Sequence, residues 1–205
     1  MKRVLILALL SLMLFCDSGM AREPHAGHSR RDRYEQRGRH RRSPYFITDD
    51  NVYFEGRLLK DASASTFKVL DDGYARDMWG VFYWGRKIEG ASSESFRVLG
   101  YGYATDAWVV YYDGEKISGA SSESFSILQD WYAKDMWNVY FDGKKISGAA
   151  PESFKVLREG YALDMWNVYF DGVKIQGASP ENFKVLRDGY ARDTWNTYYF
   201  GRKIE

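Results

Sequence analysis

Residues 132–160 read YAKDMWNVYFDGKKISGAAPESFKVLREG, and this stretch decides the fold because residues 45–205 repeat it every 29 positions. Successive units begin at residues 45, 74, 103, 132, 161 and 190, so five full units are followed by one of about half length. Such self-similarity indicates a small structural unit that is copied along the chain. The repeat region, residues 44–205, is therefore expected to form one domain.

The pattern within the quoted unit predicts a β-hairpin. Residues 132–134 and 139–141 have the composition of short strands, and Asp142-Gly143 connects the second strand to residues 144–146. Asp-Gly favours the two positive φ angles of a type I′ turn, whose twist matches that of the flanking strands. Only the glycine of this pair remains in Trp84-Gly85 and Phe200-Gly201, which allows another turn type at these two places.

Alternation along the hairpin assigns side chains to faces. Trp137, Val139 and Phe141 fall on one face, which we expect to be the apolar core that joins neighbouring units. Tyr140 falls on the other face, where Lys145 of the paired strand can cover its ring.

The segment Ala-Ala-Pro-Glu-Ser-Phe at residues 149–154 predicts a corner made of a single helical turn in each unit, because proline presets φ and the acid suits the start of a helix. A 29-residue unit cannot bury a core alone, so neighbouring units have to stack. The predicted fold is all-β, an elongated array of about six hairpin or meander repeats. A closed propeller-like arrangement is the alternative.

The pattern Asp-x-x-Asn-Val-Tyr-Phe-x-Gly-x-Lys-Ile, followed by Pro-Glu-Ser-Phe-Lys-Val-Leu, resembles the DKNYY repeat family over roughly residues 45–205. The resemblance implies an exported bacterial repeat protein of unassigned activity, and it brings no catalytic residues with it. The chain departs from the family pattern after the aspartate, where it has Met136-Trp137, Met165-Trp166 and Thr194-Trp195.

Residues 1–21 have the pattern of a signal peptide. A short basic start precedes an apolar run over residues 4–15, which is too short for a bilayer span of about 20 residues. Small residues at Gly19 and Ala21 predict cleavage after Ala21 and export to the periplasm or the medium. Cys16, the only cysteine, leaves the alternative of a lipoprotein anchored there, although the bulky Phe15 before it disfavours a lipid-attachment motif.

Residues 22–43 are predicted to be a disordered basic tether. Residues 22–42 hold eight arginines, all three histidines and three acids, with too few apolar residues for a core. The tether is either a spacer or a contact for anionic lipid, lipopolysaccharide or wall polymer. Membrane contact is expected only through the tether or through a lipid on Cys16. Because residues 43–205 hold 19 basic and 24 acidic residues, the tether can also fold back on the repeats or bridge to another copy. The whole chain has a net charge of +1, which argues against nucleic acid as a partner.

One aspartate column recurs through the repeats, at Asp77, Asp106, Asp135, Asp164 and Asp193. With Asn138 and its equivalents three residues later, this column has some of the oxygen ligands that calcium needs. An aspartate that accepts backbone N–H bonds in a turn explains the same column, and this structural role is the preferred interpretation. No metal site and no cofactor are expected.

An aromatic column accompanies it, at Trp79, Trp108, Trp137, Trp166 and Trp195. Together with Tyr140 and Tyr169, these residues are candidates either for the core or for a surface that stacks on envelope glycan. The core is the preferred role. A glycan or an envelope protein is the partner class that export suggests.

Catalysis is not expected, because residues 43–205 contain neither histidine nor cysteine and no single site stands out from its register in the repeat. A glycosidase that uses two carboxylates is a remote alternative. The sequence therefore predicts an exported, non-catalytic binding or scaffold module at the bacterial cell envelope, with a glycan-binding protein as the alternative.

Overall fold

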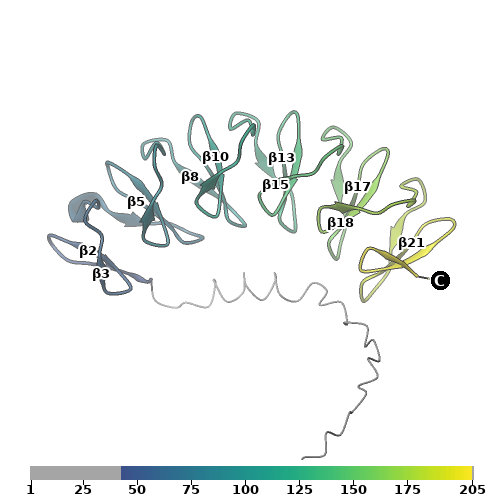
Figure 1. The fold of residues 1–205 in the computed structure, drawn as a ribbon, viewed down its shortest axis with the longest axis horizontal. Helices are drawn as coiled ribbons and strands as arrows, with labels where there is room; N and C mark the ends of the chain where they lie inside the picture. Colours follow the sequence, from purple (N-terminus) through teal and green to yellow (C-terminus); the bar gives the residue numbers. More distant parts are fainter. Residues whose placement is uncertain (1–42, 205) are drawn as a thin grey trace, which may run out of the picture.

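The computed structural model describes residues 43–204, which form an arc of six small antiparallel sheets (Figure 1). The sheets follow one another along the chain, and the two ends of the arc lie apart. This confirms the elongated all-β array, and the closed propeller-like alternative is wrong. The predicted signal peptide, Cys16 and the tether up to residue 42 lie outside the described residues.

Each sheet is a meander whose strands pair in chain order. The first sheet has three strands, β1 (Tyr45–Ile47), β2 (Val52–Phe54) and β3 (Arg57–Leu58). The second and third sheets consist of β4 (Lys68–Val69), β5 (Tyr74–Arg76), β6 (Val81–Tyr83) and β7 (Arg86–Lys87), then β8 (Arg97–Gly100), β9 (Tyr103–Thr105), β10 (Val110–Tyr112) and β11 (Glu115–Lys116).

The last three sheets have the same four-stranded order. Their strands are β12 (Ser126–Ile127), β13 (Tyr132–Lys134), β14 (Val139–Phe141), β15 (Lys144–Lys145), β16 (Lys155–Val156), β17 (Tyr161–Leu163), β18 (Val168–Phe170), β19 (Val173–Lys174), β20 (Lys184–Val185), β21 (Tyr190–Arg192), β22 (Thr197–Tyr199) and β23 (Arg202–Ile204). Every four-stranded sheet thus takes its first strand from one sequence unit and the other three from the next, which ties neighbouring units together.

The hairpin turns keep one backbone geometry throughout. Asp142 and Gly143 have φ angles of 52° and 74°, as a type I′ turn requires. Trp84 and Gly85 have φ angles of 45° and 73°. This turn therefore keeps the geometry of the Asp-Gly turns and does not adopt another turn type. Packing compensates for the bulky side chain, because the Trp84 ring lies where any side chain on Gly73 would be.

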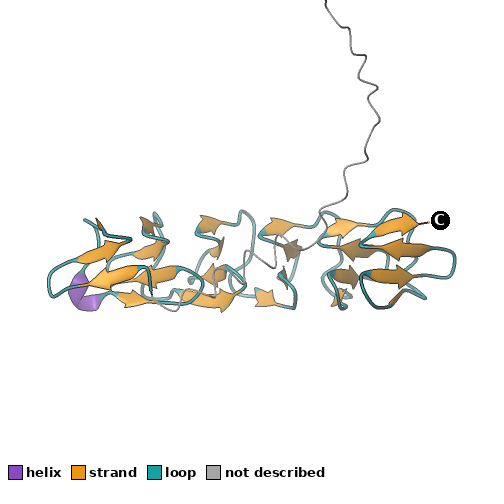
Figure 2. Cartoon of the chain, turned by 90° about the horizontal axis from the view of Figure 1, so that it is seen from below, coloured by secondary structure: helices purple, strands orange, loops and turns teal. Residues whose placement is uncertain are grey.

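The corners differ from the expectation of a helical turn in every unit. Within residues 43–204 only the first corner forms a 3₁₀ helix, η1 (Ala64–Thr66), seen as the single helix in Figure 2. Two successive bonds define it, since the N–H groups of Thr66 and Phe67 donate to the carbonyls of Ser63 and Ala64. The corner after β15 has one such bond, from the N–H of Ser153 to the carbonyl of Ala150, and is a simple turn.

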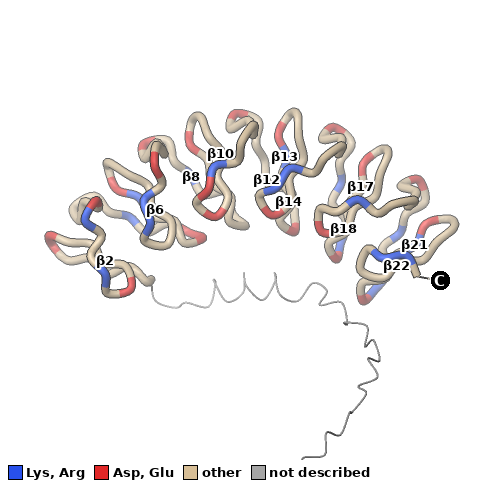
Figure 3. Tube along the Cα trace, in the orientation of Figure 1, with Lys and Arg blue, Asp and Glu red and all other residues tan. Residues whose placement is uncertain are grey.

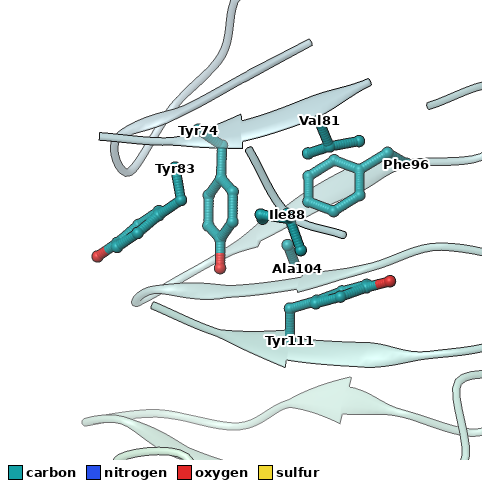
Figure 4. Packing of buried hydrophobic residues seen from close by; sticks show 7 residues of the cluster. All are labelled: Tyr74, Val81, Tyr83, Ile88, Phe96, Ala104 and Tyr111. Atoms are coloured by element: carbon teal, nitrogen blue, oxygen red, sulfur yellow. The ribbon is translucent and has the colours of Figure 1, made fainter. Parts of the chain in front are cut away.

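The core lies between neighbouring sheets. Figure 4 shows one cluster in which Tyr74, Ile88 and Phe96 meet Ala104 and Tyr111 of the next sheet. Because each inner sheet has a neighbour on both sides, both of its faces are buried. This confirms that units gain their core by stacking.

A tyrosine forms the centre of each contact between sheets. The ring of Tyr132 is fully buried and lies 5.5 Å from that of Phe154, which in turn lies 5.5 Å from the ring of Tyr169 in the following sheet. The Tyr132 hydroxyl donates to the carbonyl of Gly160 at 3.1 Å and accepts from the N–H of Gly172 at 2.9 Å. Equivalent bonds from a turn N–H to a tyrosine hydroxyl recur along the array, in the pairs Gly85–Tyr45, Gly114–Tyr74, Gly143–Tyr103 and Gly201–Tyr161.

The predicted division of the hairpin into two faces is partly wrong. The pairing of Tyr140 with Lys145 is confirmed, and Val139 and Phe141 are buried. Tyr140 is buried as well, because its face packs on Tyr103 of the preceding sheet and on the corner between the two sheets, where its ring lies 5.4 Å from that of Phe125. Trp137 is 71% exposed, because it precedes β14 and lies in a loop to which the strand alternation does not extend.

The antiparallel strands give the array two edges. We call the first the loop edge; it carries the loops at residues 48–51, 77–80, 106–109, 135–138, 164–167 and 193–196 and the corners at residues 59–67, 88–96, 117–125, 146–154 and 175–183. The opposite turn edge carries the two-residue turns. The loop edge follows the outer rim of the arc and the turn edge its inner rim (Figure 1).

The two rims are spaced differently. On the outer rim, a corner separates successive loops. On the inner rim, aromatic rings lie directly on the glycines of the following turns, as Tyr112 does on Gly143, and this difference in spacing curves the array.

The first prediction tests the buried tyrosine. Tyr132→Phe should lower the free energy of unfolding by about 1–3 kcal/mol, because the carbonyl of Gly160 and the N–H of Gly172 each lose a buried partner. Tyr190→Phe is the matched control, since the equivalent Tyr190 is 42% exposed and should change stability by less than about 0.5 kcal/mol. Urea unfolding measures both, and equal losses would contradict the assigned role.

A second prediction concerns the close approach at the turn edge. Gly143 and Gly148 both have a φ of 74°, but a Cβ on Gly143 would overlap the Tyr112 ring of the preceding sheet, whereas one on Gly148 meets nothing within 4 Å. Gly148→Ala should cost about 1–2 kcal/mol from its left-handed backbone alone. Gly143→Ala should cost clearly more in the same urea experiment, and similar values for the two would show that the ring contact is unimportant.

Candidate functional site

The loop edge places the predicted aspartates at the ends of strands, where each organises a four-residue loop. Asp135 follows β13, and its Oδ1 accepts hydrogen bonds from the N–H groups of Trp137 at 2.7 Å and Asn138 at 2.6 Å. Its Oδ2 accepts from the N–H of Ser121 at 3.0 Å and from the hydroxyl of Tyr140 at 2.8 Å. Four donors therefore occupy the two oxygens of this carboxylate.

The arrangement recurs in the other loops. Asp106, Asp164 and Asp193 each accept from two loop N–H groups, one corner N–H group and one tyrosine hydroxyl. Asp77 makes the three backbone bonds without a phenol, because Phe82 stands where the later units have tyrosine. The aspartates thus join each loop to the corner before it.

The hydrogen bonds shift the ionisation of both partners. Burial raises the pKa of the carboxylates that also bond a tyrosine hydroxyl, but hydrogen bonds to the ionised form outweigh it, so the pKa of Asp106, Asp135 and Asp164 is lowered and that of Asp193 falls to about 2. For the phenol, burial first and the bond to Asp193 second raise the pKa of Tyr198 to about 12. Carboxylates with lowered pKa values stay ionised near neutral pH and are poor general acids.

No group of three or more histidine, cysteine, aspartate or glutamate side chains within residues 43–204 is arranged to hold a metal ion. A calcium ion would have to displace the four donors that surround Asp135. In the same part of the chain, no helix has the length and apolar character needed to cross a bilayer.

The tryptophans lie at the tips of these loops and face water, so the expected role of this column in the core is wrong. Their exposed fractions range from 71% to 84%, and they are Trp79, Trp108, Trp137, Trp166 and Trp195. Met78, Met136 and Met165 beside them are also exposed. Each indole is held by a backbone whose N–H is bonded to the loop aspartate, as for Trp137 on Asp135.

Tyr140 and Tyr169, the other aromatic candidates, are buried between sheets and cannot face a ligand. The structure therefore separates the candidates into two groups. The tyrosines and aspartates hold the array together, whereas the tryptophans form a row along its outer rim.

A glutamate stands between each pair of neighbouring tryptophan loops, and the sequence analysis did not identify these residues as part of a site. Glu94 is exposed and lies between Ser93, whose hydroxyl donates to the carbonyl of Asp77, and Ser95, whose hydroxyl accepts from the N–H of Ala107 at 3.0 Å. The equivalents in the later corners are also exposed, namely Glu123, Glu152 and Glu181. Their 29-residue period was visible in the sequence, but only the fold shows that corners and loops alternate along one edge.

Charge is strongly segregated between the edges and the strands. The loops and corners of the loop edge contain one basic residue, Lys60, and thirteen acids. The acids are Asp49, Asp50, Asp61, Asp77, Glu89, Glu94, Asp106, Glu123, Asp135, Glu152, Asp164, Glu181 and Asp193. Figure 3 shows the basic residues concentrated on the strands, away from the outer loops. The loop edge is thus an acidic rim with exposed indoles.

A prediction follows for pH. Asp106, Asp135, Asp164 and Asp193 have folded pKa values below the unfolded value of about 4, so their stabilisation is complete above pH 4 and is lost as pH falls toward 2. The tyrosines have folded pKa values above the unfolded value of about 10, so their stabilisation is complete below pH 10 and is lost as pH rises toward 12. Urea unfolding across pH should therefore show a plateau with losses on both sides, and a maximum at one pH would disagree.

Comparison with known proteins agrees with the repeat architecture. The DKNYY family matches residues 45–165 and, in an overlapping second segment, residues 103–205. No curated protein and no solved structure matches the chain. The two segments together span the whole repeat region, and the chain therefore belongs to the DKNYY family.

Proposed function

We propose that this chain is an exported, non-catalytic binding module of the bacterial cell envelope, and that its loop edge is the ligand-binding surface. The observation that carries the proposal is the row of five indoles, each more than 70% exposed, at one position in five successive loops. Large apolar side chains that face water at the same position of successive loops suit a binding surface, because tryptophan is otherwise mostly covered in folded proteins.

The tryptophans are not required for the core. Tyrosine, phenylalanine and valine side chains fill the contacts between sheets, and the aspartate bonds that shape each loop involve the tryptophan backbone and not its ring. Exposing five indoles gives the fold no packing energy. A role in binding accounts for their presence at this position.

A glycan is the ligand class that we propose for this edge. The apolar face of a sugar ring stacks on an indole through hydrophobic and dispersion contacts. The glutamates between the loops, such as Glu123, provide acceptors for sugar hydroxyl groups. A polymer with repeating sugars can engage several loops at once, which raises its apparent affinity well above that of one loop.

A non-catalytic role is supported by the equivalence of the loops. A two-carboxylate glycosidase needs one acid with a raised pKa, whereas hydrogen bonds lower the pKa of Asp135 and its equivalents. Export itself rests on the sequence, namely the apolar run at residues 4–15 and the small residues before position 22.

The proposal is tested by replacing the three central tryptophans, Trp108, Trp137 and Trp166, with alanine. Binding to insoluble peptidoglycan, measured by co-sedimentation, should weaken about tenfold or more, because several stacking contacts are lost together. Melting temperature should stay nearly unchanged, since these side chains are exposed.

Phe46→Ala and Val173→Ala are the matched controls, because both side chains are exposed and lie outside the loop edge. They should leave sedimentation unchanged. Unchanged binding of the triple tryptophan variant to peptidoglycan would refute the proposed site.

A further inference from the structure

The acidic rim has a charge partner within the same chain. The loops and corners of the loop edge carry thirteen acids and one base, whereas residues 22–42, which directly precede the first sheet, carry eight arginines and three acids. The basic residues of the sheets lie on the strands (Figure 3), from which Arg76 and Lys134 donate hydrogen bonds to the corner carbonyls of Ser93 and Pro151. Two surfaces of opposite charge are therefore joined by the backbone.

We propose that the arginine-rich segment 22–42 binds the loop edge of its own chain, with its guanidinium groups on the tryptophan faces and against the glutamates between them. This proposal deepens the proposed function, because it rests on the loop edge being a binding surface and adds an internal competitor that regulates access to it.

The chemistry of the rim matches arginine closely. From Trp79 to Trp195, exposed indoles alternate with the exposed acids Glu94, Glu123, Glu152 and Glu181. A guanidinium group stacks on an aromatic face and also forms paired hydrogen bonds with a carboxylate, so neighbouring positions of the rim satisfy both of its preferences. Residues 22–42 contain no lysine, although lysine is common on the strands of the repeats.

The spacing of the arginines suits an extended segment. Arg37, Arg39 and Arg41 alternate along the chain, so an extended backbone would direct their side chains to one face. Arg31 and Arg33 repeat this spacing. An extended segment can therefore present several guanidinium groups to the rim at once.

The segment is long enough to reach the tryptophan loops. Pro44, whose carbonyl accepts from the N–H of Glu55, lies beside the first hairpin turn, so the chain enters at the turn edge and must cross one sheet. Crossing three residues of strand takes about 10 Å, and 21 extended residues span about 70 Å. Packed sheets lie about 10 Å apart, so the remaining length suffices for the first three or four tryptophan loops.

Because residues 22–42 and the loop edge belong to the same chain, the segment can occupy the rim even if its intrinsic affinity is weak. A short flexible connection gives an effective concentration in the millimolar range, so a segment of modest affinity can occupy the rim. A glycan would then have to displace it, and its apparent affinity would rise when the segment is neutralised or screened by salt.

The test uses the full chain without glycan. The eight arginines of residues 22–42 are replaced by glutamine, and the indole N–H signals of the seven tryptophans are compared by NMR with those of the unmodified chain. The signals of the loop-edge tryptophans near the first sheets should shift, and those of Trp84 and Trp131 at the turn edge should not. Acrylamide should also quench the tryptophan fluorescence of the glutamine variant more strongly than that of the unmodified chain.

Two comparisons separate stacking and pairing from non-specific charge effects. Replacing the same arginines with lysine keeps the charge but weakens stacking. The indole N–H signals of this lysine variant should therefore lie between those of the unmodified chain and those of the glutamine variant. The quadruple change Glu94→Gln, Glu123→Gln, Glu152→Gln and Glu181→Gln should release the segment while the segment's own sequence stays intact. High salt should reproduce the release.

Identical indole signals in the unmodified chain and the glutamine variant would overturn the proposal. Shifts that depend on protein concentration, or that accompany a dimer in sedimentation, would also overturn it, because they would assign the segment to a second copy. These readouts involve no glycan. If peptidoglycan does not bind but the shifts occur, the proposed ligand fails and the internal contact stands.

Discussion

A buried tyrosine hydroxyl between neighbouring sheets is the interaction on which the array depends. Each sheet is too small to enclose a core, so its tyrosine ring is covered only when the next sheet is in place. The Tyr132 hydroxyl then bonds a carbonyl and a turn N–H of that sheet, which fixes the relative position of the two sheets as well as their contact. The same bond from a turn N–H to a tyrosine hydroxyl recurs along the array.

Tyrosine and phenylalanine form the contacts between sheets, whereas the tryptophans of the loops lie outside these contacts. The inner rim is closely packed, with rings lying on the glycines of the following turns. The outer rim is spaced by corners, and its loops are held by aspartates that use backbone N–H groups as donors. The indole rings at the loop tips take no part in these bonds, and both they and the corner glutamates face water.

Much of the repeat was predictable because hydrophobic alternation and turn chemistry are local. The strands around Asp142-Gly143 and the pairing of Tyr140 with Lys145 follow from residues close in sequence. The placement of Trp137 failed for a physical reason, since alternation assigns a face only within a strand and this residue precedes β14. The prediction of a helical turn in every corner failed because the corner after β15 makes one i→i+3 backbone bond, from Ser153 to Ala150, where the first corner makes two in succession.

The sequence by itself determined the 29-residue period, the all-β class, the hairpin turns and the need for units to stack, because each of these follows from residue type and spacing. Only the tertiary structure decided which aromatic column is covered and which faces water, because burial depends on the neighbouring sheet and not on the residue's own strand. It also decided that loops and corners share one edge, since the hydrogen bonds of Asp135 and Ser93 join segments more than a dozen residues apart. The row of indoles and acids on the outer rim is a product of that arrangement.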